Sequence, residues 1–309
     1  MKLRESAKGR MRCGELGEDR LIAQLVAHLK SRPDVIAGPG DDCAVVAAPG
    51  QDRLLLLKTD CVVEQVHFQP NEKPAAVGWK AMMRTLSDFA AMSGRPQYAL
   101  VTLVARAERE VRWMTQLYKG LERAAGRFEV AIVGGETSAT KGPLVISVSV
   151  LGFVEKARCV RRNGGQAGDL LFVTGRLGGA GQGRHLNFVA RIDEARWLTQ
   201  HFRIHAMMDL SDGLGADLPR LAKASGVGFA IEEAALPRAR GCSIRQAISD
   251  GEDYELLFAL SPGDAAALEK KWRKRFPRLP LTRIGRFNQQ SAISNQQLPH
   301  GFVHFQSRG

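Results

Sequence analysis

Apolar and polar positions repeat with two different periods along the chain, and the period predicts the type of each element. Apolar residues recur every three or four positions in six segments, which we expect to be helices: 16–29, 74–92, 110–127, 186–202, 214–222 and 263–275. Short apolar runs or strict alternation predict strands at 43–46, 54–57, 99–104, 130–133, 144–154, 170–174, 206–208, 229–231 and 254–259. Strands alternate with helices in both halves, so we expect an α/β (α+β) fold.

A polar, glycine-containing stretch interrupts this pattern near the middle of the chain. Residues 155–169 read EKARCVRRNGGQAGD and follow a long alternating segment. The 309 residues of the chain suffice for two domains of ordinary size. We therefore expect one domain at 1–154 and a second at 155–309.

The composition excludes several classes of protein. Hydrophobic residues make up 44% and charged residues 25%, and no apolar run approaches the roughly 20 residues of a membrane span. The basic N-terminal segment lacks the apolar core of a secretion signal. The five cysteines are odd in number and form no CxxC pair, which fits a reducing compartment. We expect a cytoplasmic protein that has no membrane partner.

The chain carries a net charge of +12, which suits either nucleic acid or phosphorylated small molecules as partners. The densest basic block, Lys270–Arg286, has no aromatic residues at a stacking rhythm, and no nucleic-acid motif accompanies it. A solvated helix face explains it better, and we do not expect nucleic acid as a partner.

The stretch 206–218, AMMDLSDGLGADL, places two carboxylates and a hydroxyl at a turn between a strand and a helix. We expect Ser211 or Asp212 to cap that helix by accepting hydrogen bonds from its free N–H groups. Capping needs one such residue, so the surplus acids, Asp209 among them, suggest a hard cation. Asp217, one turn further along, is expected to be an ordinary surface acid.

The same arrangement, a carboxylate beside glycine or a hydroxyl at the end of an apolar run, recurs along the chain. Its five occurrences are Asp41-Asp42, Thr59-Asp60, Ser87-Asp88, Gly134-Gly135-Glu136-Thr137 and Asp209–Asp212. Asp88 is the most informative, because a charge among Leu86, Phe89 and Ala90 is costly unless it is compensated. Each acid alone is more often a cap or a surface residue. Together, and with no histidine–cysteine metal set, they favour a Mg²⁺–nucleotide site.

Other nucleotide and catalytic signatures are missing. The chain has no GxxxxGK[ST] loop, and no GxGxxG lies between a strand and a helix. The glycine-rich segment Gly175–Gly183 is a weak signal that we interpret as a flexible surface loop. No Ser–His–Asp or Cys–His signature is present, so a covalent enzyme intermediate has no support in the sequence.

An ordered set of motifs resembles the thiamine-monophosphate kinases, a family of the aminoimidazole ribonucleotide synthetase-like superfamily. The motifs are GPGDDCAVV, KTDCVVEQVHF, LSDFAAM, IVGGETSATKGPLVISVSVLGFV, MDLSDGLGADL and SDGEDYELLFAL, and the resemblance extends from about Gly14 to Phe305. It implies an N-terminal domain whose sheet joins that of a partner in a homodimer, followed by a C-terminal α/β domain. ATP and several Mg²⁺ ions are then expected between the domains and near the dimer interface.

The implied reaction transfers the γ-phosphoryl group of ATP to thiamine monophosphate, giving thiamine diphosphate. The acceptor oxygen is already anionic, so no protein nucleophile or general base is expected. The obstacle is the repulsion between two polyanions, which several Mg²⁺ ions held by a ring of aspartates, with help from Arg162, would screen.

The resemblance also implies roles for particular residues. It implies metal binding by Asp42, Thr59, Asp60, Asp88, Asp209 and Asp212; ATP binding by Gly135, Glu136, Arg162 and Ser211; and substrate binding by His67 and Glu252. Without the resemblance, His67 would be interpreted as a half-buried structural histidine and Glu252 as a loop acid.

The chain departs from the family pattern at several of these places. Lys58 lies where the family has serine or threonine, and Glu136 replaces an aspartate. Asp250 replaces a glycine, and Pro299-His300 replaces an aromatic residue that helps to hold the substrate's ring system. The motifs therefore support binding of metal and ATP better than they support the identity of the acceptor.

Two other functions fit parts of the sequence. An ATP-dependent enzyme of the same superfamily with a different acceptor would explain Asp250 and the missing aromatic residue. A degenerate paralogue that binds nucleotide or nucleic acid without turnover would explain the basic surface and the altered GGET segment. The full set of aspartates argues against the second alternative, since a protein without activity has little reason to keep a charge as costly as Asp88.

Overall fold

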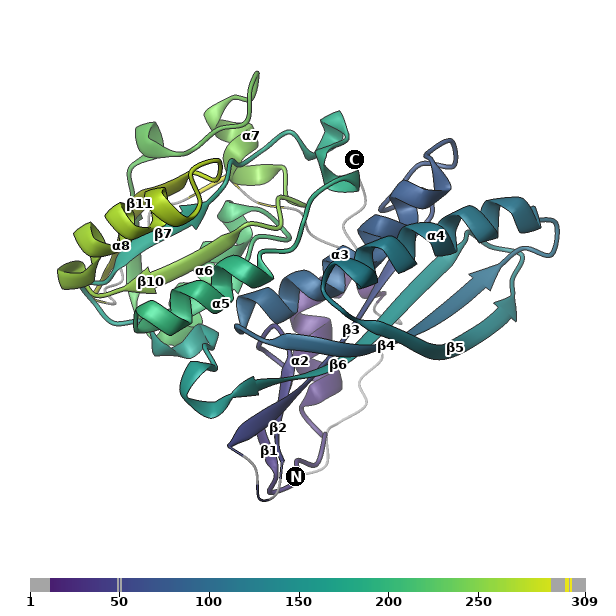
Figure 1. The fold of residues 1–309 in the computed structure, drawn as a ribbon, viewed down its shortest axis with the longest axis horizontal. Helices are drawn as coiled ribbons and strands as arrows, with labels where there is room; N and C mark the ends of the chain where they lie inside the picture. The colour runs from purple at the N-terminus through teal and green to yellow at the C-terminus, as the bar shows by residue number, and fades with distance from the viewer. Residues whose placement is uncertain (1–11, 49, 51, 290–297, 300, 302–309) are drawn as a thin grey trace, which may run out of the picture.

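Two β-sheets side by side form the core of the chain (Figure 1). The computed structural model describes residues 12–48, 50, 52–289, 298, 299 and 301. The first sheet takes its strands from residues 35–155 and the second from residues 170–288. Within the described residues, no helix is both long and apolar enough to cross a membrane.

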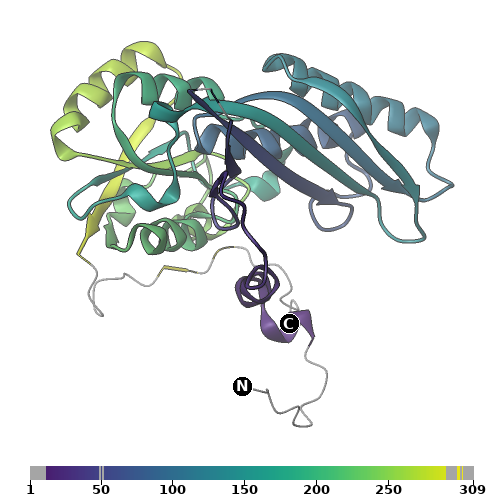
Figure 2. The same cartoon turned by 90° about the horizontal axis from the view of Figure 1, so that it is seen from below.

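The N-terminal sheet has six strands in the order β1-β2-β3-β6-β4-β5. Its strands are β1 (Val35–Ala37), β2 (Ala44–Ala47), β3 (Arg53–Val63), β4 (Arg95–Ala105), β5 (Ala131–Ala139) and β6 (Val145–Glu155). All neighbours pair antiparallel except β4 and β5, which are parallel. The short helices α1 (Cys13–Leu16) and α2 (Glu18–Val26) precede the sheet and stand apart from both sheets (Figure 2).

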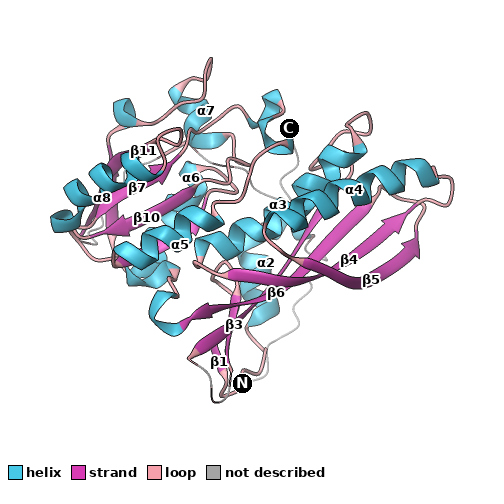
Figure 3. Cartoon of the chain, viewed as in Figure 1, coloured by secondary structure: helices cyan, strands magenta, loops and turns pink. Residues whose placement is uncertain are grey.

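Helices α3 (Pro74–Ala91) and α4 (Val111–Arg127) cover one face of the N-terminal sheet, as Figure 3 shows. The opposite face carries large apolar side chains that remain exposed. They are Leu55, Leu57, Tyr98, Leu100, Val133 and Leu151. Period-2 alternation explains this distribution, because Leu54 and Leu56 of β3 are buried while Leu55 and Leu57 point to the open face.

The C-terminal sheet has five antiparallel strands in the order β8-β10-β7-β11-β9. Its strands are β7 (Leu170–Thr174), β8 (Ile204–Asp209), β9 (Gly228–Ile231), β10 (Leu256–Leu260) and β11 (Leu281–Asn288); its helices are α5 (Ile192–His201), α6 (Leu214–Ser225), α7 (Ile244–Ser249) and α8 (Pro262–Arg275). Phe172 packs with residues of α5 and α8, whereas Leu171 packs with residues of α6 and α7. The sheet is therefore buried on both faces, which explains why β10 reads as an unbroken apolar run.

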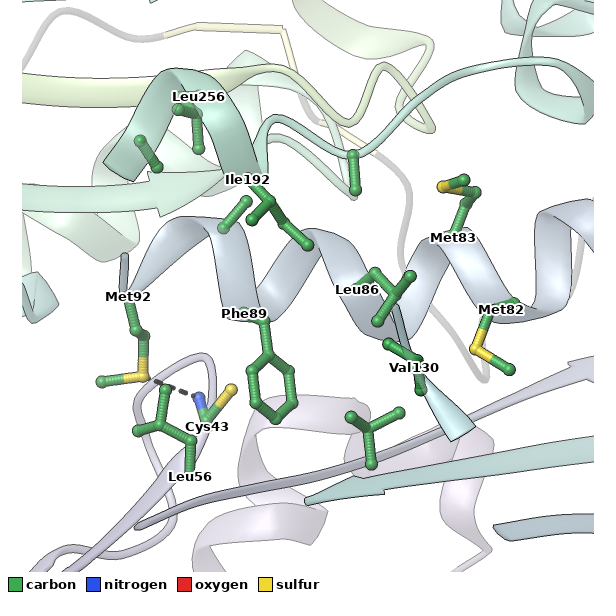
Figure 4. Packing of buried hydrophobic residues seen from close by; sticks show 14 of the residues in the cluster. Cys43, Leu56, Met82, Met83, Leu86, Phe89, Met92, Val130, Ile192 and Leu256 are labelled. Carbon is green, nitrogen blue, oxygen red and sulfur yellow. Dashed lines mark hydrogen bonds between the residues drawn. The ribbon is translucent and has the colours of Figure 1, made fainter. Parts of the chain in front are cut away.

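Helix α3 connects the two halves, because it packs against both. In Figure 4, Phe89 and Met82 point from α3 towards the N-terminal sheet, while Met83 points to the opposite side of the helix. One buried cluster joins Phe89, Leu56 of β3, Ile192 of α5 and Leu256 of β10. At its edge the backbone N–H of Cys43 donates a hydrogen bond to Sδ of Met92, at 3.1 Å.

The predicted fold class is confirmed, but several element boundaries differ. The strand expected at 54–57 continues to Val63, so Thr59 and Asp60 lie inside β3 and not after it. The helix expected at 186–202 starts only at Ile192, after two short 3₁₀ turns. The GGET segment expected to follow a strand forms part of strand β5. For β3 and β5, pairing with the neighbouring strands β6 and β4 extends the strand beyond its local apolar run.

Candidate active site

Three carboxylates from distant parts of the chain meet where the two halves join. Asp42 precedes β2, Asp88 is on α3, and Asp209 ends β8. All three are buried, and their ligand oxygens lie within 4.8 Å of one another. We call these three residues the carboxylate cluster.

Hydrogen bonds and ion pairs orient each member of the carboxylate cluster. The guanidinium of Arg162 donates from Nε to Oδ2 of Asp42 at 3.2 Å and from Nη2 to Oδ1. The hydroxyl of Ser87 donates to Oδ2 of Asp209 at 2.6 Å. Nζ of Lys58 lies 2.7 Å from Oδ1 of Asp88. Every oxygen named here has an oriented donor, and the cluster is thus held in place by the fold.

Burial makes the negative charges of this cluster costly. It raises the pKa of Asp209 to about 7, with repulsion from Asp42 adding to the effect. Burial also raises the pKa of Asp88 well above its usual value, although the charge of Lys58 works against this rise. Carboxylates that are difficult to ionise when packed together are stabilised by a cation among them.

The cluster fits a hard divalent cation. Its members offer only oxygen donors, and the buried charge exceeds what Arg162 and Lys58 can neutralise. Mg²⁺ takes carboxylate oxygens and keeps positions open for phosphate oxygens. Asp42, Asp88 and Asp209 could hold such an ion, and Asp60 lies close enough to Asp88 to raise its pKa.

Of the residues expected among the metal ligands, Thr59 and Asp212 do not belong to the carboxylate cluster. In β3 the pleat turns Thr59 to the open face of the sheet, where Ser149 donates a hydrogen bond to its hydroxyl at 2.9 Å. Asp60, the next residue, points to the α3 side. Within one chain, the side chains of Thr59 and Asp60 therefore lie on opposite faces of the sheet, and metal binding by Thr59 stays a prediction. The side chain of Asp212 pairs with Arg220 and lines a pocket beside the cluster.

Backbone hydrogen bonds bring the DLSDG and GEDYEL motifs together. The N–H of Glu252 donates to the carbonyl of Ser211 at 2.7 Å, and that of Tyr254 donates to the carbonyl of Leu210 at 2.8 Å. Glu252 and Tyr254 both have left-handed φ angles, of 52° and 50°. Strained backbone of this kind is typical of functional loops.

The capping prediction for α6 is wrong. The N-cap residue is Gly213, with φ of 95°, and no side chain caps the helix. A Cβ at Gly213 would meet the backbone of Ile248 and Gly251, so the close approach of two loops requires glycine there. Ser211 and Asp212 instead lie along the pocket.

The expectation that Asp217 is a surface acid is also wrong. Its carboxyl is fully buried in the first turn of α6. Oδ2 accepts a hydrogen bond from the N–H of Asp212 at 2.9 Å, and Oδ1 accepts one from Arg220 at 3.1 Å. Burial, and then the charge of Asp212, raise the pKa of Asp217. This residue shapes the DLSDG turn from within the fold.

The pocket beside the cluster, which we call the acceptor pocket, collects the predicted substrate residues. Its lining includes His67, Ser211, Asp212 and Glu252, together with Arg84, His185, Asp250 and Tyr254. The last four were not predicted to bind substrate. Both halves of the chain contribute to this lining, which explains why no single motif identifies all of it.

Lys80 is a further residue that the sequence patterns did not indicate. Its side chain is fully buried on α3 and reaches the carbonyl of His67 at 2.5 Å, Nδ1 of His185 at 2.6 Å and Oε1 of Glu252 at 2.6 Å. Burial lowers its pKa to about 8, against the opposing effect of Glu252. A lysine inside the apolar run WKAMM is the signal that could have revealed it.

The glycine-rich segment Gly175–Gly183 is not a flexible surface loop. The N–H of Gly178 donates to Asp253 at 2.8 Å, and that of Gly179 donates to Asp250 at 3.0 Å. Both glycines are buried and have positive φ angles. Asp250, one of the departures from the family pattern, thus holds this segment against the GEDYEL loop.

Gly135 and Glu136 lie far from the carboxylate cluster within the chain. They belong to β5, the edge strand of the N-terminal sheet, and both are exposed. A Cβ at Gly135 would overlap the backbone of Val101 on the paired strand, so close packing of the two strands explains why this position is glycine. The aromatic residue of the family pattern is replaced in this chain by Pro299-His300, of which His300 lies outside the described residues.

Comparison with known proteins defines the class to which this site belongs. Residues 40–154 match the model of the AIR synthase related protein N-terminal domain, and residues 166–286 match that of the C-terminal domain. Hydrogenase maturation protein HypE in complex with ATP shares the fold alone, with a TM-score of 0.65 at 19% identity over 94% of this chain and 96% of that one.

More similar relatives narrow the class. The thiamine-monophosphate kinase of Rhodopirellula baltica is 36% identical, over 93% of this chain and 97% of its own. That of Aquifex aeolicus is 34% identical, over 96% and 100%. A solved structure described as AaThiL complexed with AMPPCP and TMP matches with a TM-score of 0.82 at 34% identity, over 96% of this chain and 100% of that one. This chain belongs to the thiamine-monophosphate kinase family of AIR synthase related proteins, which confirms the resemblance.

Proposed function

We propose that the chain transfers the γ-phosphoryl group of ATP to thiamine monophosphate and so forms thiamine diphosphate. The observation that carries the proposal is the meeting of the carboxylate cluster with the acceptor pocket at the junction of the two halves. The relative of known structure that is complexed with AMPPCP and TMP supports it. We assign 1–154 as the dimerisation and ATP/Mg-binding domain and 155–309 as the C-terminal domain.

Asp42, Asp60, Asp88 and Asp209 would hold Mg²⁺, whose charge would screen the repulsion between the phosphates of ATP and of the acceptor. Arg162 orients Asp42 and adds a positive charge on the side of the C-terminal half. Ser87 keeps Asp209 in place with a short hydrogen bond. The chemistry needs positioning and charge compensation more than proton transfer, because the acceptor phosphate is already anionic. This agrees with a site of carboxylates and cationic side chains.

The acceptor pocket suits a phosphorylated, cationic heterocycle. Glu252 supplies a carboxylate for the positive ring, and Lys80 and His185 fix the position of that carboxylate. Tyr254 offers an aromatic surface beside it, stacked on Phe188 with ring centroids 4.0 Å apart. His67, which accepts a hydrogen bond at Nδ1 from the N–H of Val63, also lines this pocket.

We propose a homodimer formed through the open face of the N-terminal sheet. Six large apolar side chains are exposed there, and their exposed fractions range from 36% for Leu55 to 59% for Val133. An exposed apolar face of this kind marks an interaction surface. Pairing would also give Gly135, Glu136 and Thr59, which face away from the cluster of their own chain, a place near the site of the partner. The reaction would take place in the cytoplasm, in line with five free cysteines.

The test is to incubate the protein with ATP, Mg²⁺ and thiamine monophosphate and to measure thiamine diphosphate. We expect product from the wild type, and a rate about 100-fold lower for Asp42→Asn, since loss of a metal ligand removes charge compensation. Asp52→Asn, an exposed aspartate in the same half of the chain, is the control and should keep full activity. A wild type that binds ATP without forming product would refute the proposed function.

A further inference from the structure

Lys58 lies inside the carboxylate site and is bound to two of its acids. Its Nζ is 2.7 Å from Oδ1 of Asp88 and 3.8 Å from Oδ1 of Asp60. Lys58 and Asp60 are two residues apart on β3, so both side chains point to the α3 side of the sheet, where Asp88 lies. The ammonium group therefore occupies the space between the two carboxylates.

The net charge of the residues around Lys58 limits the number of metal ions that can bind there. The carboxylate cluster and Asp60 bring four negative charges together. Among the described residues, the basic groups in ion-pair contact with them are Lys58 and Arg162. Two negative charges remain, which is the charge that one divalent ion neutralises.

Sterics point to the same conclusion. A divalent ion that bridges two carboxylates lies about 2.0–2.6 Å from their oxygens. An ammonium at 2.7 Å from Asp88 occupies that position, so both cations cannot be present at once. Lysine is also a compact point charge that can donate to phosphate oxygens as well as to carboxylates.

From these observations we propose that Lys58 is a resident cation that takes the place of one divalent metal ion between Asp60 and Asp88. The inference rests on the proposed function, because it concerns the metal requirement of that same site. A chain with a small neutral residue at position 58 would then bind one more metal ion. The sequence departs from the family pattern at this residue, where the resemblance leads one to expect serine or threonine.

The experiment counts bound Mn²⁺ by electron paramagnetic resonance, in the presence of a non-hydrolysable ATP analogue. We expect Lys58→Ser to bind one more Mn²⁺ per chain than the wild type. Lys58→Arg keeps the charge and should bind the same number as the wild type. Lys119→Ser, at an exposed lysine of α4, controls for the loss of one positive charge elsewhere.

An equal number of ions in Lys58→Ser and the wild type would overturn the proposal. If Lys58→Ser does not fold, Lys58→Thr restores a residue with high strand propensity and gives the same comparison. A second measurement is the rise in melting temperature on adding Mn²⁺, which should be larger without the lysine; an equal rise contradicts the inference. Failure of the wild type to form thiamine diphosphate would refute the proposed function separately, because the ion count does not depend on turnover.

Discussion

Replacing Asp209 by asparagine should stabilise the metal-free protein at neutral and alkaline pH. The carboxylate is 3% exposed, lies against Asp42 and accepts a hydrogen bond from Ser87. Asparagine has nearly the same shape, and its amide oxygen can accept the same hydrogen bond. The substitution therefore removes a buried charge without opening a cavity.

The expected magnitude follows from the pKa of Asp209. Burial raises this pKa from 3.8 to about 7. Each unit of pKa corresponds to about 1.4 kcal/mol, so the ionised carboxylate costs up to about 4 kcal/mol at high pH. Lys58 and Arg162 share the charge, and we expect a gain of about 2–4 kcal/mol at pH 8.

The sign of the pH dependence is equally specific. The folded-state pKa lies above the unfolded value, so the folded protein binds more protons between about pH 4 and pH 7. The contribution of Asp209 to the free energy of unfolding is therefore lost as the pH rises through this range. Below pH 4 the wild-type residue is neutral, and the two proteins should have nearly equal stability.

The assay is urea denaturation with EDTA at pH 4 and pH 8, for the wild type, Asp209→Asn and the control Asp52→Asn. The exposed control should change the free energy of unfolding by less than about 0.5 kcal/mol. Adding Mg²⁺ should stabilise the wild type and leave Asp209→Asn almost unchanged. A lower stability of Asp209→Asn at pH 8, or a difference that does not vary with pH, would refute the reasoning.

Three further substitutions test other parts of the structure. Arg191→Met leaves the buried carboxylate of Glu255 without the guanidinium that now lies 2.7 and 2.5 Å from its oxygens. Urea denaturation should show a free energy of unfolding lower by about 2–3 kcal/mol, and an unchanged midpoint would contradict this. Leu100→Glu places a charge on the open sheet face, so sedimentation should show monomers instead of dimers, while a persistent dimer would exclude this face. Glu252→Gln removes the charge opposite the cationic ring, so steady-state kinetics should give a KM for thiamine monophosphate about 10-fold higher and an unchanged KM for ATP. Equal effects on both KM values would argue against binding of the ring by Glu252.

The hydrophobic pattern predicted an element well where the residues that are buried are the apolar positions of that segment's own periodicity. The run at 170–174 forms β7 with the expected boundaries, and the segment 74–92 forms α3 to within a residue. Asp88 was expected to need compensation, and Lys58 supplies it. In these cases the stability of the element depends on residues close in sequence, or on the cost of burying a charge, which arises in any fold.

The predictions that were wrong share a different cause. The strand predicted to end at Leu57 continues to Val63 because it pairs with β6, and its pleat turns Thr59 to the open face of the sheet. Asp217 has the pattern of an exposed helical acid, yet Arg220 and the N–H of Asp212 provide partners that allow it to be buried. Both outcomes depend on contacts that form only after the chain has folded.

The sequence was sufficient to define the family, the fold class and the residue types of the site, because motifs, periodicity and donor chemistry are local properties. It could not show that Asp42, Asp88 and Asp209 come within 4.8 Å of one another while Asp212 turns to Arg220. Nor could it show that Lys58 fills the space between Asp60 and Asp88. These distances arise where a loop, a strand, a helix and a second sheet pack together, and that packing is decided by the buried core of the whole chain.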